Sequence, residues 1–356
     1  GRWNALTDVP GVRVGHTTLV AGDGPLVVGR GPVRTGVTAI LPHDGPVWAR
    51  QVPAAVRVLN GAGELTGWAQ IQEYGTLESP IVLTNTMSVG AAHRGCLDWL
   101  VAREPALIDD FVLPVVSETY DGFLNDAIGQ HVRPEHVVAA LDAAATGPFA
   151  RGNVGGGTGM GLFGFKGGIG TSSRVTEPGW TVGVLIQGNF GRRHQLRIDG
   201  DPVGRRLTDL APVRGSSPRP PEGGPAPEPA REGSIVVVIA TDAPLSDRQL
   251  GRLAERGKLG IARTGGIAGN SSGDLLLAFS TAPEVQVPRG PAPFTDRGPP
   301  RLLTTPRLHD AWIDLLFEAV IDATEEAIVD ALVAADTMVG RDGNTLFGIP
   351  HDRIRR

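Results

Sequence analysis

The sequence predicts a layered α/β fold, and three observations point to it. The run Ile235–Ala240 is almost entirely β-branched, which is typical of a central strand buried on both faces. Along the rest of the chain, short β-rich segments alternate with segments whose apolar residues recur at helical spacing. The 356 residues are 41% hydrophobic and 20% charged, which is enough apolar material for a large core. Length alone is compatible with one domain or two.

Strands are expected where β-branched segments lie next to glycine turns, and helices where apolar residues recur every three or four positions. The spacing Ser246-x-x-Gln249 is that of a capping box, and Pro134 suits the first turn of another helix. On these criteria strands are predicted at 12–18, 36–42, 81–84, 113–120, 181–187 and 275–281. Helices are predicted at 54–59, 66–74, 90–102, 133–145, 246–262 and 308–335.

Glycines cluster at 152–159 and again at 167–170, just after Lys166. A phosphate-binding loop would need Gly-Lys-Ser/Thr leading directly into a helix. Lys166 instead stands between Phe165 and Gly167 in a strand-like stretch. The pattern therefore favours glycine turns around a β-hairpin over a phosphate cradle.

The segment 211–232 is rich in Pro and Gly and has almost no apolar periodicity, which predicts an exposed linker. It ends at Gly233-Ser234, immediately before the predicted central strand. A cut there would leave a serine with its own base, because a free α-amine has a pKa of roughly 7.7 to 8.0 and can accept the hydroxyl proton. Taken alone, however, the feature favours the simpler interpretation that Ser234 opens a strand.

The charge and the special residues exclude several classes of protein. A net charge of −5 and a pI near 5.9, without a basic tract, argue against nucleic-acid or membrane partners and favour a small substrate. No apolar run approaches the roughly 18 residues of a membrane span. The single cysteine, Cys96, lies in an apolar helix-like stripe and fits packing in a reducing, cytoplasmic compartment. The eight histidines form no ligand motif, so no metal or cofactor is expected.

Motifs spread over nearly the whole chain resemble one family. They occur in the same order at Leu6–Val12, Val14–Thr18, Gly152–Gly159, Phe165–Arg174, Gly233–Pro244, Ala323–Ala327 and Gly348–Asp352. The family is that of the self-processing N-terminal-serine aminopeptidases, which includes the L-aminopeptidase/D-amidase-esterases and the β-peptidyl aminopeptidases.

The resemblance implies an αββα sandwich, similar to that of the N-terminal-nucleophile hydrolases but with its own connectivity. It implies one catalytic domain over residues 1–356. Cleavage between Gly233 and Ser234 would divide this domain into an α-part, 1–233, and a β-part, 234–356, that stay together. A homo-oligomer is also implied.

Site roles are carried over from the same resemblance. Ser234 matches the nucleophile, and Ser272 and Asp274 match the pair that hydrogen-bonds around it. Tyr120 and Asn189 match donors to the developing oxyanion, a role that suits a phenol and an amide. Glu118 matches the carboxylate that meets the free amine of the substrate. Asp274 departs from relatives that have Glu at this position, so its reach is shorter by one methylene.

The function implied is a serine aminopeptidase that releases N-terminal residues from short peptides, amides or esters through an acyl-enzyme. Two alternatives remain at this point. The same acyl-enzyme could pass to an amine, as in an acyltransferase, or the protein could be a non-catalytic binding member. Without the resemblance, each of the site residues has an ordinary structural role in a strand, turn or loop. The sequence does not determine whether L-α-, D- or β-amino acid derivatives are preferred.

Overall fold

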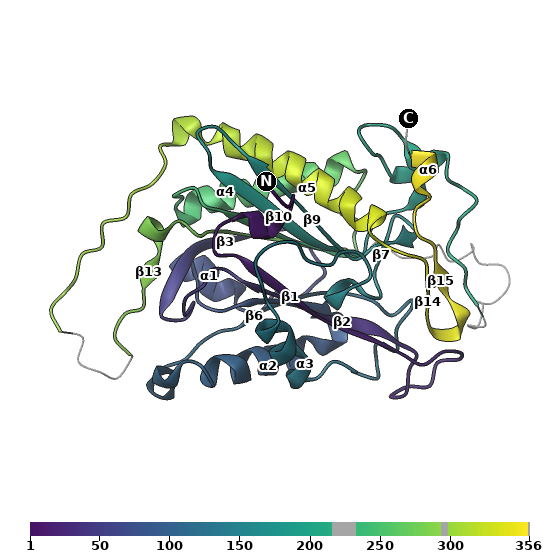
Figure 1. Ribbon diagram of the computed structural model, residues 1–356, viewed down its shortest axis with the longest axis horizontal. Helices are drawn as coiled ribbons and strands as arrows, with labels where there is room; N and C mark the ends of the chain where they lie inside the picture. Colours follow the sequence, from purple (N-terminus) through teal and green to yellow (C-terminus); the bar gives the residue numbers. More distant parts are fainter. Residues whose placement is uncertain (216–232, 293–297, 355–356) are drawn as a thin grey trace.

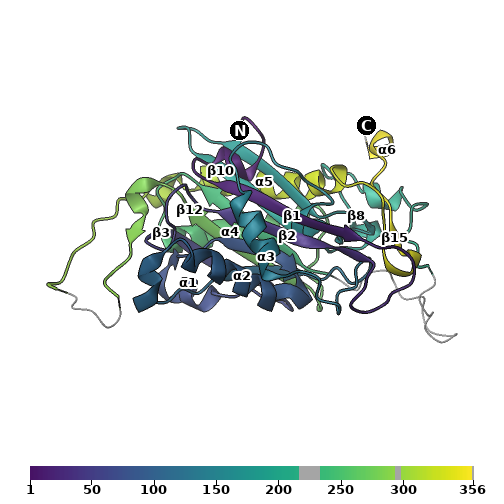
Figure 2. The same cartoon turned by 60° about the horizontal axis from the view of Figure 1, so that its bottom comes forward.

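The computed structural model describes residues 1–215, 233–292 and 298–354 of the chain. Two β-sheets lie face to face between two layers of helices (Figure 1). Helices α4 (Asp247–Arg263) and α5 (Asp314–Val333) cover the outer face of one sheet, and α2 (Val89–Val101) and α3 (Pro134–Asp142) cover the other. Figure 2 shows α2 and α3 in front of the sheet that they cover. The architecture is the αββα sandwich that the sequence predicted.

The first sheet has four strands, in the order β1 (Arg13–Ala21), β2 (Val33–Leu41), β5 (Ile81–Asn85) and β6 (Val115–Thr119). Its pairs are antiparallel except β5 with β6, which is parallel. The connection between these parallel strands contains α2, as parallel strands require a crossover. Glu118 and Tyr120, the two site residues predicted near the end of β6, therefore lie at the edge of the sheet where β5 also ends.

The second sheet has seven strands, and β11 lies inside it. The order is β13 (Val287–Pro288), β3 (Arg50–Gly61), β12 (Gly273–Ser280), β11 (Ile235–Thr241), β10 (Thr181–Gly188) and β9 (Ile169–Val175), with β4 (Thr76–Leu77) also pairing with β3. Only the β11–β12 pair is parallel. As a result β11 and β12 both begin at the same edge, where β10 ends.

The side chains of β11 alternate between two cores. Ile235, Val237 and Ile239 pack toward α4 and α5, and Val236, Val238 and Ala240 pack between the two sheets. A third core lies between the first sheet and the helices α2 and α3, and it contains the buried Cys96. The β-branched run is thus buried on both faces, as the sequence predicted.

The smaller elements border the sandwich. A hairpin of β7 (Gly161–Leu162) and β8 (Phe165–Lys166) confirms the predicted glycine turns around Lys166. A second hairpin is formed by β14 (Met338–Val339) and β15 (Thr345–Leu346). Two short α-helices are α1 (Trp68–Tyr74) and α6 (His351–Ile354).

One element was assigned wrongly from the sequence. Residues 54–59 were expected to be helical, but they belong to the long strand β3, which pairs with β12. A short apolar run fits the 3.6-residue period of a helix as well as the two-residue period of a strand. Here the side chains of Val52, Ala54 and Val56 follow the two-residue period and face the other sheet. The helices α3 and α5 are also shorter than expected, whereas the cap of α4 is confirmed because Ser246 accepts a hydrogen bond from the Gln249 N–H.

Most of the predicted linker, 216–232, lies outside the described residues. Its first part is fixed to the body, because Val213 and Thr345 exchange backbone hydrogen bonds of 3.0 and 2.9 Å. None of the helices in the described ranges is long and apolar enough to cross a membrane.

Candidate active site

Ser234 lies immediately before β11, at the edge of the sheet where β10 ends and β12 begins. Its backbone carbonyl accepts a 2.8 Å hydrogen bond from the N–H of Asn189, the residue after β10. Its side-chain Oγ accepts a 3.1 Å hydrogen bond from the N–H of Gly273, the first residue of β12. The side chain is nearly buried, at 6% exposure. Two neighbouring strands therefore fix the position of this hydroxyl.

Gly233 is held against Asn189 so closely that no other residue fits. A Cβ at position 233 would overlap the backbone carbonyl oxygen of Asn189 and lie 2.9 Å from its Nδ2. The carbonyl oxygen of Gly233 accepts a short hydrogen bond from the Ser272 hydroxyl. The peptide group between Gly233 and Ser234 is thus oriented by the Ser272 hydroxyl and by the close approach of Asn189.

Ser272 also lies 2.6 Å from Oδ1 of Asp274, a residue of β12 that is only 1% exposed. A serine hydroxyl has one proton, so Ser272 donates at any moment either to Asp274 or to the Gly233 carbonyl. Asp274 also pairs with Ile235 in the parallel ladder, which places it beside the residue after Ser234. The shorter side chain at 274 therefore reaches Ser272 despite the missing methylene.

The amide of Asn189 has a defined orientation. Its Oδ1 accepts a 2.8 Å hydrogen bond from the N–H of Gly161, and its Nδ2 donates a 2.7 Å hydrogen bond to the backbone carbonyl of Tyr120. An amide nitrogen carries two hydrogens, so Nδ2 retains a second donor beside Gly233. This is the geometry expected of a donor to an oxyanion.

Lys166 fixes the loop that orients Asn189. It is fully buried, and its Nζ donates to the carbonyl oxygens of Gly157, Met160 and Gly167 at 3.2, 2.7 and 2.6 Å. Burial lowers the pKa of Lys166 to about 7. The carbonyl of Met160 and the N–H of Gly161 belong to one peptide group, so Lys166 and Asn189 bind its two ends. Hydrogen bonds in such a chain polarise one another, and this one ends at the Asn189 amide.

Tyr120 follows β6 and is half exposed. Its ring lies over the backbone of Gly122, where a Cβ would overlap the phenol oxygen. Gly122 is therefore needed for the Tyr120 side chain to lie where it does, a requirement that the Asp-Gly turn in the sequence did not reveal.

Glu118 is buried at the end of β6, with 3% exposure. Its Oε1 accepts a 2.9 Å hydrogen bond from the N–H of Glu64, and its Oε2 accepts a short one from the Thr86 hydroxyl. Burial raises the pKa of Glu118, and the hydrogen bonds from Thr86 and Glu64 oppose that rise. An approaching ammonium would supply the positive charge that the buried carboxylate lacks.

One cavity of about 510 Å³ brings these residues together. Ser234, Asn189, Tyr120 and Glu118 all line it, while Ser272 and Asp274 lie behind Ser234. Its remaining walls are formed by Ala62, Thr86, Gly122, Phe123, Arg214, Gly233, Ser271, Arg341 and Asn344. The structure thus gathers all six predicted side chains in one place, although their chemical roles remain predictions.

Several residues of the site were missed by the sequence reasoning. Arg214, Arg341 and Asn344 line the cavity but lie in segments without a motif. For Lys166 the sequence was tested only against a phosphate-binding loop, which it does not fit, and its contact with the loop that orients Asn189 was missed. Its one local signal is a lysine in an otherwise glycine-rich and apolar stretch.

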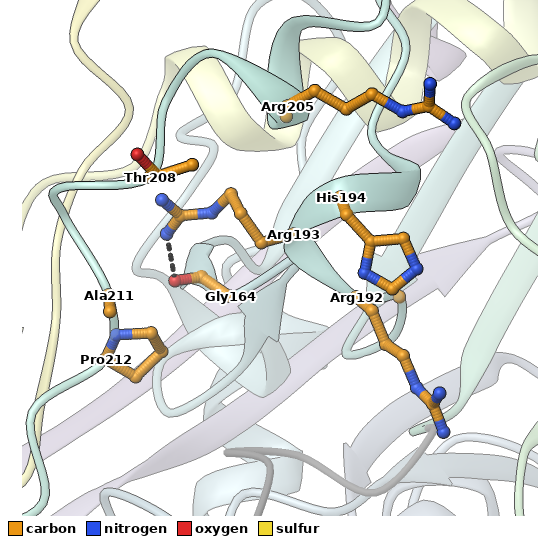
Figure 3. A pocket seen from close by; sticks show the side chains of 10 residues that line it. Gly164, Arg192, Arg193, His194, Arg205, Thr208, Ala211 and Pro212 are labelled. Carbon is orange, nitrogen blue, oxygen red and sulfur yellow. Dashed lines mark hydrogen bonds between the residues drawn. The ribbon is translucent and has the colours of Figure 1, made fainter.

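A larger cavity of about 590 Å³ lies beside the hairpin β7–β8 (Figure 3). Arg193, His194 and Arg205 contribute to its walls, but no serine, cysteine or carboxylate does. The guanidinium of Arg193 points to Gly164 and donates to four backbone carbonyls, those of Phe163, Gly164, Leu207 and Leu210. Its hydrogen-bonding capacity is therefore used within the protein. Within residues 1–215, 233–292 and 298–354, no group of three or more His, Cys, Asp or Glu side chains could hold a metal ion.

Solved structures similar to this one define the class of protein. A Burkholderia sp. β-aminopeptidase superposes with a TM-score of 0.84 at 46% identity, covering 99% of this chain and 92% of that chain. The L-aminopeptidase D-Ala-esterase/amidase of Ochrobactrum anthropi superposes with a TM-score of 0.85 at 41% identity, with the same coverage. It is described as a prototype for the serine aminopeptidases and as a new variant of the Ntn hydrolase fold. The present fold is of this type.

The sequence comparisons agree. The chain is 46% identical to the β-peptidyl aminopeptidase BapA of Sphingosinicella xenopeptidilytica, over 100% of this chain and 87% of the relative. The model of peptidase family S58 matches residues 4–346. The chain therefore belongs to peptidase family S58 and is a hydrolase of the serine aminopeptidase class. The family and the enzyme class predicted from the sequence are confirmed.

Proposed function

We propose that the protein cleaves its own chain between Gly233 and Ser234 and then uses Ser234 to release N-terminal residues from short peptides, amides or esters. The observation that carries the proposal is the Gly233–Ser234 peptide group in the cavity. Its carbonyl oxygen is bound by Ser272, and the side chains of Asn189 and Glu118 line the same space.

Self-cleavage would begin with attack of Ser234 Oγ on the carbonyl carbon of Gly233. The C–N bond breaks, the amine of Ser234 takes a proton, and the acyl group moves to oxygen as an ester. Water then hydrolyses the ester, which leaves a carboxylate on Gly233 and a free hydroxyl and α-amine on Ser234. Asn189 and Tyr120 would stabilise the oxyanion, and losing one such donor typically costs about 100- to 1,000-fold in rate.

Turnover would use the same groups. The α-amine of Ser234 accepts the hydroxyl proton as Oγ attacks the substrate carbonyl, and it returns a proton to the leaving amine. Water resolves the acyl-enzyme by the reverse sequence. The Glu118 carboxylate would bind the substrate ammonium and so select the carbonyl adjacent to a free chain end, whether the first residue is an L-α-, D- or β-amino acid.

Intact-mass measurement of the purified protein tests self-cleavage. The wild type should give two fragments, the second beginning at Ser234, while Ser234→Ala should remain one inactive chain. Ser246→Ala, at the N-cap of α4, is a matched control and should be cleaved. An intact wild type that hydrolyses amides at a normal rate would contradict the proposal.

N-acetylation tests the role of Glu118. A charge-assisted hydrogen bond is worth roughly 1.5 to 3 kcal/mol, so free-amine substrates should react about ten to a hundred times faster than their acetylated forms. Glu118→Gln should shrink this ratio mainly by slowing the free-amine substrate. Equal kcat/KM values for both substrates with the wild type would show that the cavity does not use the ammonium.

A further inference from the structure

We propose that Arg214 and Arg341 form a subsite for a free carboxylate on the leaving group, so that dipeptides are preferred over their carboxamides. The inference rests on the proposed function and extends it to the far side of the bond that is cleaved. Both arginines line the cavity that contains Ser234 and Glu118.

Within the described part of the chain, Arg214 has no ion pair and Arg341 has only a long one with its neighbour in the sequence. Arg214 makes no ion pair or hydrogen bond there through its guanidinium, which lies 5.6 Å from the ring centre of Phe123. The nearest carboxylate to Arg341 is that of the adjacent Asp342, at 3.7 Å, and the buried Nε of Arg341 has no hydrogen-bond partner. This contact is through Oδ2 of Asp342, whose Oδ1 is shared with the backbone because it accepts a 2.8 Å hydrogen bond from the N–H of Leu26.

Two arginines that border other cavities, Arg193 and Arg289, use their donors within the protein. Arg193 donates to four backbone carbonyls, and Arg289 forms ion pairs of 2.6 and 2.7 Å with the buried carboxylates of Glu78 and Asp110. Arg214 and Arg341 differ because they retain donors that face the catalytic cavity. A guanidinium with free donors binds a carboxylate strongly, often through two parallel hydrogen bonds.

The subsite is held together by Asn344, which is 1% exposed. Its Nδ2 donates a 2.9 Å hydrogen bond to the carbonyl of Phe123, and its Oδ1 accepts one of 3.1 Å from the N–H of Gly215, next to Arg214. The N–H of Arg341 donates a 2.8 Å hydrogen bond to the carbonyl of Leu124. The two arginines are therefore fixed to each other and to the segment that follows β6.

That segment presents its groups in a useful order. Glu118 comes first, Tyr120 is next, and then Phe123 lies beside Arg214 while the carbonyl of Leu124 binds the N–H of Arg341. A dipeptide presents a matching order, with its ammonium, the reacting carbonyl and then its carboxylate. A cavity with one carboxylate and two guanidinium groups thus complements a zwitterionic peptide that has its reacting carbonyl at Ser234.

The test compares two leaving groups behind the same N-terminal residue X, which is chosen as the one that the wild type cleaves fastest as an X-anilide. The probes are X-Ala and X-Ala-NH₂. The wild type should have a kcat/KM about ten to a hundred times higher for X-Ala, the range of a charge-assisted hydrogen bond. In Arg341→Met and in the double variant Arg214→Met/Arg341→Met, the kcat/KM for X-Ala should fall to that for X-Ala-NH₂, chiefly through a higher KM for X-Ala. Arg341→Lys keeps the positive charge and should retain part of the preference for X-Ala.

Arg205→Met, in the neighbouring cavity, is the matched control and should keep the wild-type ratio. Intact mass and a thermal melt confirm that each variant is processed and folded. Equal kcat/KM for both probes in the wild type, or a ratio that survives loss of both arginines, would overturn the subsite while the aminopeptidase activity stands. Failure of the wild type to cleave any free-amine compound would overturn the proposed function, and the subsite with it.

Discussion

Replacing Lys166 by Met should impair turnover without touching the cavity. Methionine has nearly the length of lysine but no donor, so the carbonyls of Gly157, Met160 and Gly167 lose their shared partner. The peptide group 160–161 then keeps its N–H bond to Asn189 and a 3.1 Å hydrogen bond from the Gly167 N–H to its carbonyl, but it loses the lysine donor. The amide of Asn189 should become less well oriented as a result.

The magnitudes follow from these contacts. The carbonyls of Gly157 and Met160 keep backbone donors, the N–H groups of Met160 and Gly167, so among the described residues only the carbonyl of Gly167 is left without one. A buried carbonyl left without a donor costs about 1 to 3 kcal/mol, and removing a charge that burial disfavours offsets part of the total loss. We expect a net loss of about 1 to 3 kcal/mol in the free energy of unfolding. A misplaced catalytic group costs up to about 100-fold in rate, so kcat should fall about 10- to 100-fold while KM changes little.

The assay is steady-state kinetics on the processed enzyme, together with urea unfolding and the affinity of a substrate-like aldehyde. The aldehyde forms a tetrahedral adduct with an oxyanion, so its binding should weaken in parallel with kcat, which a purely structural role would not cause. Lys258→Met is the matched control, because Lys258 is the only other lysine in the sequence and pairs with Glu255 on α4. A folded Lys166→Met enzyme with wild-type kcat and aldehyde affinity would refute the reasoning.

Two further predictions concern Ser272 and Asp121. Ser272→Ala should slow self-cleavage, turnover or both, with a loss of stability near 1 kcal/mol, as followed by fragment formation and melting; unchanged rates would remove Ser272 from the mechanism. Burial raises the pKa of Asp121 to about 7, while hydrogen bonds from Thr35 and Asn125 oppose the rise. The unfolded chain therefore releases this proton first, and stability falls by up to about 4 kcal/mol between about pH 4 and pH 7. Asp121→Asn mimics the protonated acid and should flatten this part of the stability profile; an unchanged slope would exclude Asp121 as its source.

The elements that the sequence predicted well carry their own local signal. The β-branched run of β11 and the Ser246 cap of α4 are determined by neighbouring residues, and both are present in the structure. Residues 54–59 were misassigned because a short run of alanine and valine fits a helix and a strand equally well. The antiparallel pairing of β3 with β12 makes this segment a strand. The resemblance to a family supplied the six predicted site residues, which lie together in the structure.

The missed residues act through contacts between distant parts of the chain. Asn344 binds the carbonyl of Phe123 across 221 positions in the sequence, and no local pattern marks either residue. Lys166 acts on a loop only six to nine residues away, but its effect on Asn189 passes through the backbone of residues 160–161. Backbone contacts of this kind leave no signature in residue types. Only the folded chain reveals them.

The position of Ser234 also explains why a cut before it would not separate the two parts. Glu118, Tyr120 and Asn189 belong to the part before the cut, and Ser272 and Asp274 to the part after it. Strand β11 would begin at the new terminus, yet it pairs with β10 from the first part on one side and with β12 on the other. Helix α5 likewise packs on β9 and β10. Because the two parts share one sheet and its cores, cleavage would free an amine at the end of a strand that remains fixed on both sides. The proposed base would therefore form beside the hydroxyl that it must deprotonate.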